Sequence, residues 1–79
     1  MEPYLAEIKA FTFPYAPTGW AECNGAVWQI IQNTALFSLI SNKFGGNGTT
    51  TFALPNLANA APPGMKYYIC TNGYYPSRP

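Results

Sequence analysis

The segment from Gly45 to Leu57 constrains the fold of this chain more than any other. It reads Gly-Gly-Asn-Gly-Thr-Thr-Thr-Phe-Ala-Leu-Pro-Asn-Leu, a glycine-rich loop followed by a Thr-Thr-Phe-x-Leu-Pro-x-Leu string. Glycine adopts backbone angles closed to other residues, and proline stops a strand, so the segment predicts a loop and then a short extended stretch that ends at Pro55. The string has no obvious catalytic use, and we interpret it as a structural signature.

Short strands are predicted before this segment. Residues 7–13 alternate apolar and polar side chains and end at a proline, which favours a half-buried strand. Residues 20–23 indicate a second strand. The Asn24-Gly25 pair that follows is a strong signal for a type I′ hairpin, which would return the chain through a strand at residues 26–30.

One helix is predicted at about residues 33–43. Its apolar stripe, at helical spacing, consists of Leu36, Phe37, Leu39 and Ile40. Asn33 is the predicted N-cap, because its side chain can accept hydrogen bonds from the free amides of the first turn. Gly45-Gly46 ends the helix.

The last predicted strand covers residues 66–71 and is β-prone on both faces. A small, uncharged connector at residues 59–64 precedes it. The sequence therefore predicts one α+β domain over residues 1–79, with short antiparallel strands and one helix.

The surface of this chain is expected to be an interface. Charged residues make up 9% of the sequence and aromatic residues 16%, whereas ordinary soluble domains are about 25% charged. Large exposed aromatic patches mark interaction surfaces, and copies of the same chain are the natural partner. The candidate interface residues are Tyr4, Phe11, Phe13, Tyr67, Tyr68, Tyr74 and Tyr75.

Nucleic acid and membranes are not expected partners. The net charge is +1, and the four basic residues are scattered along the chain as Lys9, Lys43, Lys66 and Arg78, whereas nucleic acid selects clustered basic residues. No apolar run approaches the roughly 20 residues that span a bilayer. The N-terminus lacks the basic start and apolar middle of a secretory signal, so no classical signal peptide is expected.

The chain has few side chains of the kinds that catalyse reactions. We therefore do not expect an enzyme, and we predict no catalytic, cofactor-binding or metal-ligating residue. The chain has no histidine and three carboxylates, Glu2, Glu7 and Glu22. Its serines therefore lack a histidine to activate them, and two cysteines without histidine leave a zinc site half built. The glycine-rich loop follows the helix instead of opening one and has no Lys-Ser/Thr after it, which argues against a phosphate site and any nucleotide cofactor.

The two cysteines, Cys23 and Cys70, leave three alternatives open. They form an intrachain disulfide, remain two buried thiols, or link two chains. An intrachain bridge would close a loop of nearly fifty residues, which contributes on the order of 4 kcal/mol in the chain-entropy model.

Several motifs in order along the chain resemble a known family. They are Gly19-Trp20-Ala21-x-Cys23-Asn24-Gly25, Gln32-Asn33-x-Ala35-Leu36-Phe37-Ser38-Leu39, the Gly-Gly-x-Gly loop, Thr50-Thr51-Phe52-Ala53-Leu54-Pro55-Asn56-Leu57, and the terminal Pro76-Ser77-Arg78. Together they closely resemble the phage tail collar family, which includes the bacterial microcystin-dependent proteins. The resemblance covers nearly the whole chain.

The resemblance implies a small α+β fold with a structural function. Members are similar to a domain of phage short tail fibres, a trimerising or assembling part of extracellular or virion fibres. In longer relatives the Leu-Pro-Asp-Leu string runs into Arg-Gly-Arg and a long variable insertion associated with target contact. Here Leu57 is followed by the short stretch 58–64 and then the last strand. The receptor-reading insertion is missing, which favours a scaffold over an adhesin.

Two hypotheses follow. The leading one is a non-enzymatic structural subunit, extracellular or virion-associated, that self-assembles into a fibre by β-strand addition; a filament ranks slightly above a closed trimer. The alternative is a small receptor- or glycan-binding tip of a phage tail or related injection machine. Other tail or fibre proteins and surface glycans are then further expected partners. A sugar site would place tyrosines in a pocket beside Asn or Asp, whereas a scaffold would bury them between chains.

Overall fold

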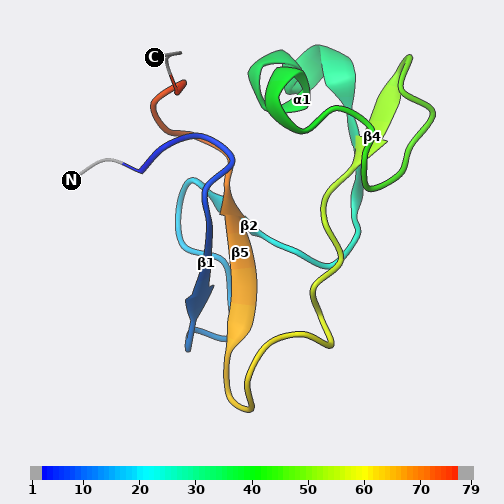
Figure 1. The fold of residues 1–79 in the computed structure, drawn as a ribbon. Helices are drawn as coiled ribbons and strands as arrows, with labels where there is room; N and C mark the ends of the chain where they lie inside the picture. Colours follow the sequence, from blue (N-terminus) through cyan, green and yellow to red (C-terminus); the bar gives the residue numbers. More distant parts are fainter. Residues whose placement is uncertain (1–2, 77–79) are drawn as a thin grey trace.

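The computed structural model describes residues 3–76, so Glu2 and the Ser77-Arg78 end of the last motif lie outside the described residues. Within this range, five short strands form two antiparallel sheets beside one α-helix (Figure 1). The predicted α+β class with short antiparallel strands and one helix is confirmed.

The larger sheet contains β1 (Ile8–Phe11), β2 (Trp20–Glu22) and β5 (Lys66–Cys70) in the order β1-β5-β2. Ile8 lies opposite Ile69 on one side of β5, and Trp20 lies opposite Cys70 on the other. The last strand in the sequence is thus the central strand of the sheet.

The smaller sheet contains β3 (Val27–Gln29) and β4 (Thr51–Ala53), so the predicted hairpin between residues 20–23 and 26–30 is wrong. Gly25 has a φ of 82°, but Asn24 does not adopt the positive φ that a type I′ turn also needs at its first central position. Asn24 instead forms a bridge to Asn56, and the Gly25 amide donates to the Pro55 carbonyl oxygen at 3.3 Å. This crossing directs β3 away from β2 and toward β4.

The helix α1 (Thr34–Ile40) follows a 3₁₀ turn η1 (Ile30–Gln32) and is shorter than the predicted 33–43. It ends early because Ser41 leaves the helical region with a φ of 56°. Asn33 does occupy the N-cap position, but the predicted capping bond is absent. Its side-chain nitrogen instead donates to the Gln29 carbonyl oxygen at 3.0 Å, which ties the helix start to the end of β3.

The main core lies between the larger sheet and the layer of α1 and β4, which occupy opposite sides of Figure 1. Its fully or nearly fully buried members are Leu5, Cys23, Leu36, Ile40, Phe52, Leu54 and Ile69. The Phe37 ring packs edge-on against Phe52, with ring centroids 5.5 Å apart. The predicted helical stripe thus supplies two buried residues, Leu36 and Ile40, and two half-buried ones, Phe37 and Leu39.

The glycine-rich loop packs directly on β4. Gly46 has a φ of 83°, and a Cβ atom placed there would lie 2.4 Å from the Phe52 Cα atom, so only glycine fits. The Ala53 amide donates to the Gly45 carbonyl oxygen at 3.1 Å. The loop therefore covers the side of β4 that faces away from β3, which is a structural role.

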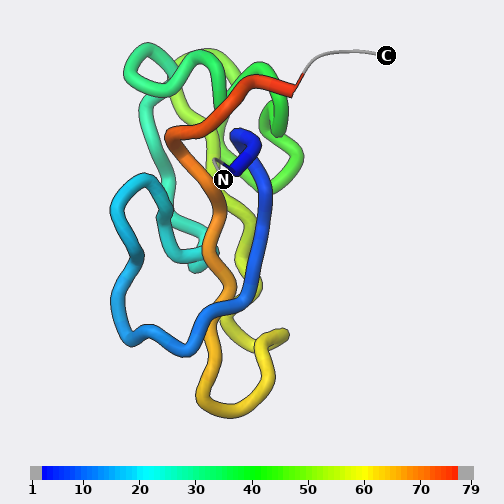
Figure 2. Tube along the Cα trace, turned by 90° about the vertical axis from the view of Figure 1, so that its left-hand side faces the viewer, coloured from blue at the N-terminus to red at the C-terminus, as the bar shows by residue number. Residues whose placement is uncertain are grey.

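Both faces of the larger sheet are covered. Antiparallel register and alternation place Ile69 and Cys23 on the face toward the main core, which we call the core face. Tyr68 and Trp20 lie on the opposite face, which we call the aromatic face. The chain between β1 and β2, a broad loop drawn from blue to cyan in Figure 2, supplies its cover, since Phe13 stacks on Phe11 with ring centroids 5.5 Å apart.

Candidate functional site

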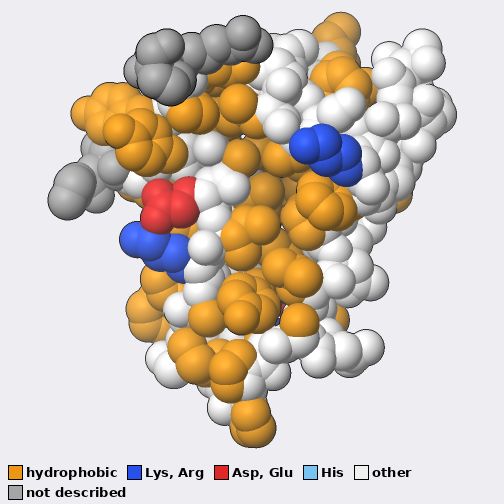
Figure 3. Space-filling model, viewed as in Figure 1, with side chains coloured by type: hydrophobic (Ala, Val, Ile, Leu, Met, Phe, Trp, Pro, Cys, Tyr) orange, Lys and Arg blue, Asp and Glu red, His pale blue; other side chains and the backbone are white. Residues whose placement is uncertain are grey.

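Three of the predicted interface residues are exposed on the paired segments near the two chain ends. Tyr4, Tyr74 and Tyr75 are 60%, 61% and 54% exposed. We call these three residues the terminal aromatic surface. Figure 3 shows hydrophobic side chains gathered on this part of the molecule, with acidic and basic side chains beside them.

The backbone holds the terminal aromatic surface in place. Tyr4 and Tyr74 form a parallel bridge. The Tyr74 amide donates to the Pro3 carbonyl oxygen at 3.0 Å, and the Leu5 amide donates to the Tyr74 carbonyl oxygen at 2.7 Å. The two tyrosine side chains are therefore neighbours on backbone that is held by hydrogen bonds. The pairing between the two segments is limited to this single bridge.

Tyr75 is anchored to the helix. Its hydroxyl lies 2.7 Å from Ser38 Oγ, and that oxygen already donates its one hydrogen to the Ala35 carbonyl oxygen at 2.6 Å. The Tyr75 hydroxyl is therefore the donor in this pair. The ring of Tyr75 remains half in solvent while its polar end is satisfied within the chain.

The other predicted interface residues are buried within the single chain to different extents. Phe13 is 46% exposed and Phe11 is half-buried. Phe11 packs edge-on against Trp20 at 5.2 Å and contacts Tyr68 at 5.7 Å between ring centroids. Tyr67 is half-buried against the main core.

Tyr68 was predicted to be an interface residue, but it is buried. Its side chain has no exposed surface, and its hydroxyl donates to the Phe13 carbonyl oxygen at 2.7 Å. The loop after β1 folds over the aromatic face and covers the ring. A residue buried inside its own chain cannot contact a partner, so Tyr68 is a core residue.

A second apolar surface was not predicted from the sequence. Ile31 is 82% exposed and Val27 is 61% exposed, and both lie on the β3–η1 segment. We call these two residues the β3 surface. Strand alternation contained the signal, because Trp28 faces the core opposite Phe52 and its neighbour Val27 must then face outward. Two further exposed rings, Tyr15 and Phe44, lie in loops.

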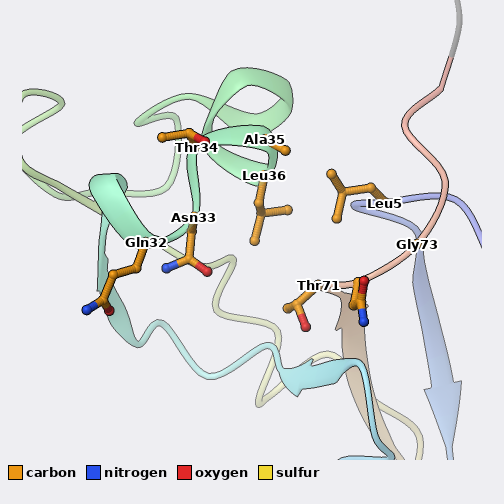
Figure 4. A pocket seen from close by; sticks show the side chains of 9 residues that line it. Leu5, Gln32, Asn33, Thr34, Ala35, Leu36, Thr71 and Gly73 are labelled. Carbon is orange, nitrogen blue, oxygen red and sulfur yellow. The ribbon is translucent and has the colours of Figure 1, made fainter.

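The hollows of the described surface offer few groups that could bind a ligand. One of about 250 Å³ lies between the start of α1 and the end of β5, where Leu5 and Leu36 face each other with Thr71 below them (Figure 4). Others of about 500 and 420 Å³ lie beside the β3 surface, near Thr50 and Trp28. Among the described residues, no tyrosine and no carboxylate lines any of these three hollows.

Cys23 and Cys70 are both free and buried in the structure. The register of β2 and β5 explains this. Cys70 lies opposite Trp20 on the aromatic face, whereas Cys23 belongs to the core face and donates its amide to the Tyr67 carbonyl oxygen at 3.0 Å. Side chains on opposite faces of one sheet cannot meet, so of the three alternatives the structure has two buried thiols. Burial, with a smaller effect from the Glu22 carboxylate, raises the pKa of Cys23 to about 11.

Both described glutamates are paired with lysines at the surface. Glu7 lies 3.1 Å from Lys9, and Glu22 lies 3.7 Å from Lys66. The hydrogen bond from Lys9, followed by that from the Tyr4 amide, lowers the pKa of Glu7 below its usual value. Within residues 3–76, no group of three histidine, cysteine or acidic side chains is placed to hold a metal ion.

A comparison with protein families gives one match. The model of the family described as the Phage Tail Collar Domain matches residues 6–62, which is more than half of the chain. Neither the curated proteins nor the solved structures contain a significant match. Across the described part of the chain, no helix has both the length and the apolar character required to cross a membrane.

Proposed function

This chain belongs to the phage tail collar family, and from that membership we propose that it is a non-enzymatic structural subunit of a phage tail fibre or related extracellular fibre. We further propose that it assembles with copies of itself. The observation that carries the proposal is the terminal aromatic surface, where Tyr4 and Tyr74 are each about 60% exposed on fixed backbone. Exposed clustered rings on a chain with 9% charged residues favour contact with another protein surface.

The positions of the exposed apolar residues favour an open filament over a closed trimer. The terminal aromatic surface and the β3 surface lie on opposite sides of the molecule, since Figure 1 shows the blue and red segments next to the chain ends on one side and β4, the partner of β3, on the other. A contact that joins two different patches is heterologous, and heterologous contacts that do not close into a ring produce fibres.

The outer edge of β1 supports assembly by strand addition. The hydrogen bond from the Cys70 amide to the Glu7 carbonyl oxygen, at 2.8 Å, sets which residues of β1 bond to β5. By alternation, the backbone groups of Ile8 and Ala10 then point away from β5. These groups are available to an extended segment of another copy or of another fibre protein, without any need for charged side chains.

We propose that residues 1–79 act as one domain. The family match ends at residue 62, but β5 lies beyond it and is the central strand of the larger sheet. A unit without β5 would leave β1 and β2 with no partner. The matched region and the last strand therefore belong to one folding unit.

The glycan-binding alternative has less support. A sugar site of the expected kind places tyrosines in a pocket beside Asn or Asp. The one hollow with a large ring is the one beside Trp28, yet that ring faces the core opposite Phe52. With the exposed tyrosines outside the described hollows, contact with another protein surface accounts for them better.

The test is electron microscopy with sedimentation of the wild type and of two variants. The double variant Tyr4→Ser/Tyr74→Ser removes the terminal aromatic rings and keeps the backbone bridge, and Tyr15→Ser removes a ring that is 72% exposed in the loop between β1 and β2. We expect fibres for the wild type and the Tyr15 variant, and single subunits for the double variant. Discrete trimers would replace the filament with a closed assembly. A wild type that stays monomeric at high concentration would reject self-assembly.

A further inference from the structure

The sequence contains three Asn-Gly pairs, Asn24-Gly25, Asn47-Gly48 and Asn72-Gly73. In such a pair the glycine nitrogen can attack the asparagine side-chain carbonyl carbon, because no Cβ atom on the second residue hinders the approach. All three asparagines are exposed, so exposure does not distinguish them. We propose that Asn72 is the site of spontaneous deamidation in the folded protein and that the fold protects Asn24 and Asn47.

Asn47 is locked by its own loop. Its Oδ1 atom accepts hydrogen bonds from the amides of Thr49, Thr50 and Thr51 at 2.8, 2.8 and 3.0 Å. Its Nδ2 atom donates to Thr50 Oγ1 at 2.9 Å. The attacking group is also engaged, because the Gly48 amide donates to the Thr51 carbonyl oxygen at 2.9 Å. Reaction requires several of these bonds to break together.

Asn24 is held by the crossing between the two sheets. The Gly25 amide donates to the Pro55 carbonyl oxygen at 3.3 Å, and Asn24 Oδ1 accepts from the Ala26 amide at 3.1 Å. The Asn24 backbone also forms the bridge to Asn56. Both the attacking nitrogen and the side-chain carbonyl group therefore point to other partners.

Asn72 has neither restraint. Within residues 3–76 no hydrogen bond engages its side-chain amide or the Gly73 amide. The two residues that flank the pair are restrained. The Thr71 amide donates to the Gly19 carbonyl oxygen at 2.8 Å, and the Tyr74 amide donates to the Pro3 carbonyl oxygen at 3.0 Å. Figure 4 shows Thr71 and Gly73 where the chain leaves β5 beside the hollow at the start of α1.

The reaction needs only water. The Gly73 nitrogen loses its proton and bonds to the Asn72 side-chain carbonyl carbon, and the side-chain amide group takes up a proton and leaves as ammonia. The resulting five-membered imide is hydrolysed by one water molecule at either carbonyl carbon. One product is aspartate, and the other is isoaspartate, in which the backbone runs through the former side chain.

The product strains a segment that is restrained on both sides. Isoaspartate lengthens the backbone by one methylene group between Thr71 and Tyr74, and either product adds a negative charge. A Cβ atom at Gly73 would lie 2.4 Å from the Pro3 carbonyl oxygen, so this segment has no room to bulge toward the segment that carries Pro3. The bridge between Tyr4 and Tyr74 must loosen to take up the extra length. The inference does not depend on the proposed function.

The experiment is peptide mass spectrometry of the protein after incubation at mildly alkaline pH, folded and in denaturant. In the unfolded chain all three pairs react at similar rates. We expect folding to leave the rate at Asn72 within a few-fold of its unfolded value. Folding should slow Asn24 and Asn47 by at least about tenfold, which corresponds to about 1.4 kcal/mol. Equal slowing at all three sites, or faster reaction at Asn47 than at Asn72, would overturn the proposal.

The variant Asn72→Gln is the matched control, because glutamine keeps the exposed amide but closes the imide ring far more slowly. Aged wild type should show increased hydrogen exchange at the Leu5 and Tyr74 amides, which form the bridge, and the aged variant should not. The same increase in the variant would show that loosening of the Tyr4–Tyr74 bridge has another cause and would reject the structural consequence.

Discussion

The two faces of the larger sheet are buried in different ways. On the core face, Ile69 belongs to the buried cluster of the main core, which also contains Leu36 and Ile40 of α1. On the aromatic face, Tyr68 is equally buried, but its cover is a loop that carries Phe13 and is largely exposed itself. Neighbouring residues of one strand are thus buried by the main core on one face and by a loop on the other. The difference indicates that the core face carries most of the stability and that the aromatic face can open locally.

The largest expected effect is on the core face. Ile69→Ala removes a fully buried side chain from the main core, and we expect a loss of about 2–5 kcal/mol in the free energy of unfolding. That is a large part of the ~4–12 kcal/mol expected for a chain of this length. Urea denaturation followed by circular dichroism measures it. A loss below about 1 kcal/mol would remove the distinction between the two faces.

A smaller effect is expected on the aromatic face. Tyr68→Phe keeps the ring and removes the hydrogen bond to the Phe13 carbonyl oxygen, which water can then satisfy because Phe13 is exposed. We expect a loss of about 0.5–1.5 kcal/mol. Hydrogen exchange should rise in residues 12–19 and stay unchanged in α1. A rise spread over the whole molecule would show that the loop does not open by itself.

The effect expected from pH is confined to alkaline solution. The pKa of Cys23 on the core face is raised to about 11 from an ordinary value of 9.0, mainly by burial. The folded state therefore favours the neutral thiol, and its contribution to stability is complete below pH 9.0 and is lost as the pH rises toward 11. Thermal melting of the wild type and Cys23→Ala across this range measures the contribution. The wild type should lose more stability than the variant, whereas parallel curves would contradict the assignment.

Local sequence patterns predicted the elements better than their pairing. The helical stripe at Leu36 and Ile40 and the strand at 66–71 both correspond to observed elements, because periodicity is a local signal. The predicted hairpin at Asn24-Gly25 is wrong because the partner of β3 is β4, which follows α1 and the glycine-rich loop in the sequence. A turn signal cannot report the competing bridge between Asn24 and Asn56.

The predicted interface residues show the same limit. Composition predicted tyrosines at an interface, and Tyr4, Tyr74 and Tyr75 are exposed. It could not separate these from Tyr68, because the loop that covers Tyr68 comes from a segment 55 residues earlier in the chain. The β3 surface was missed because the prediction of a strand at residues 26–30 did not say which of its faces packs on the core, although alternation places Val27 opposite to Trp28.

The central position of β5 affects how the chain is made. During synthesis from the N-terminus, β1 and β2 leave the ribosome with no partner, because both pair only with β5. The larger sheet cannot close until Cys70 has been added, so this sheet forms only after most of the chain has been translated. Until then, the nascent chain exposes two unpaired strands and the aromatic side chains beside them, and a second nascent chain nearby offers the same strands as competing partners.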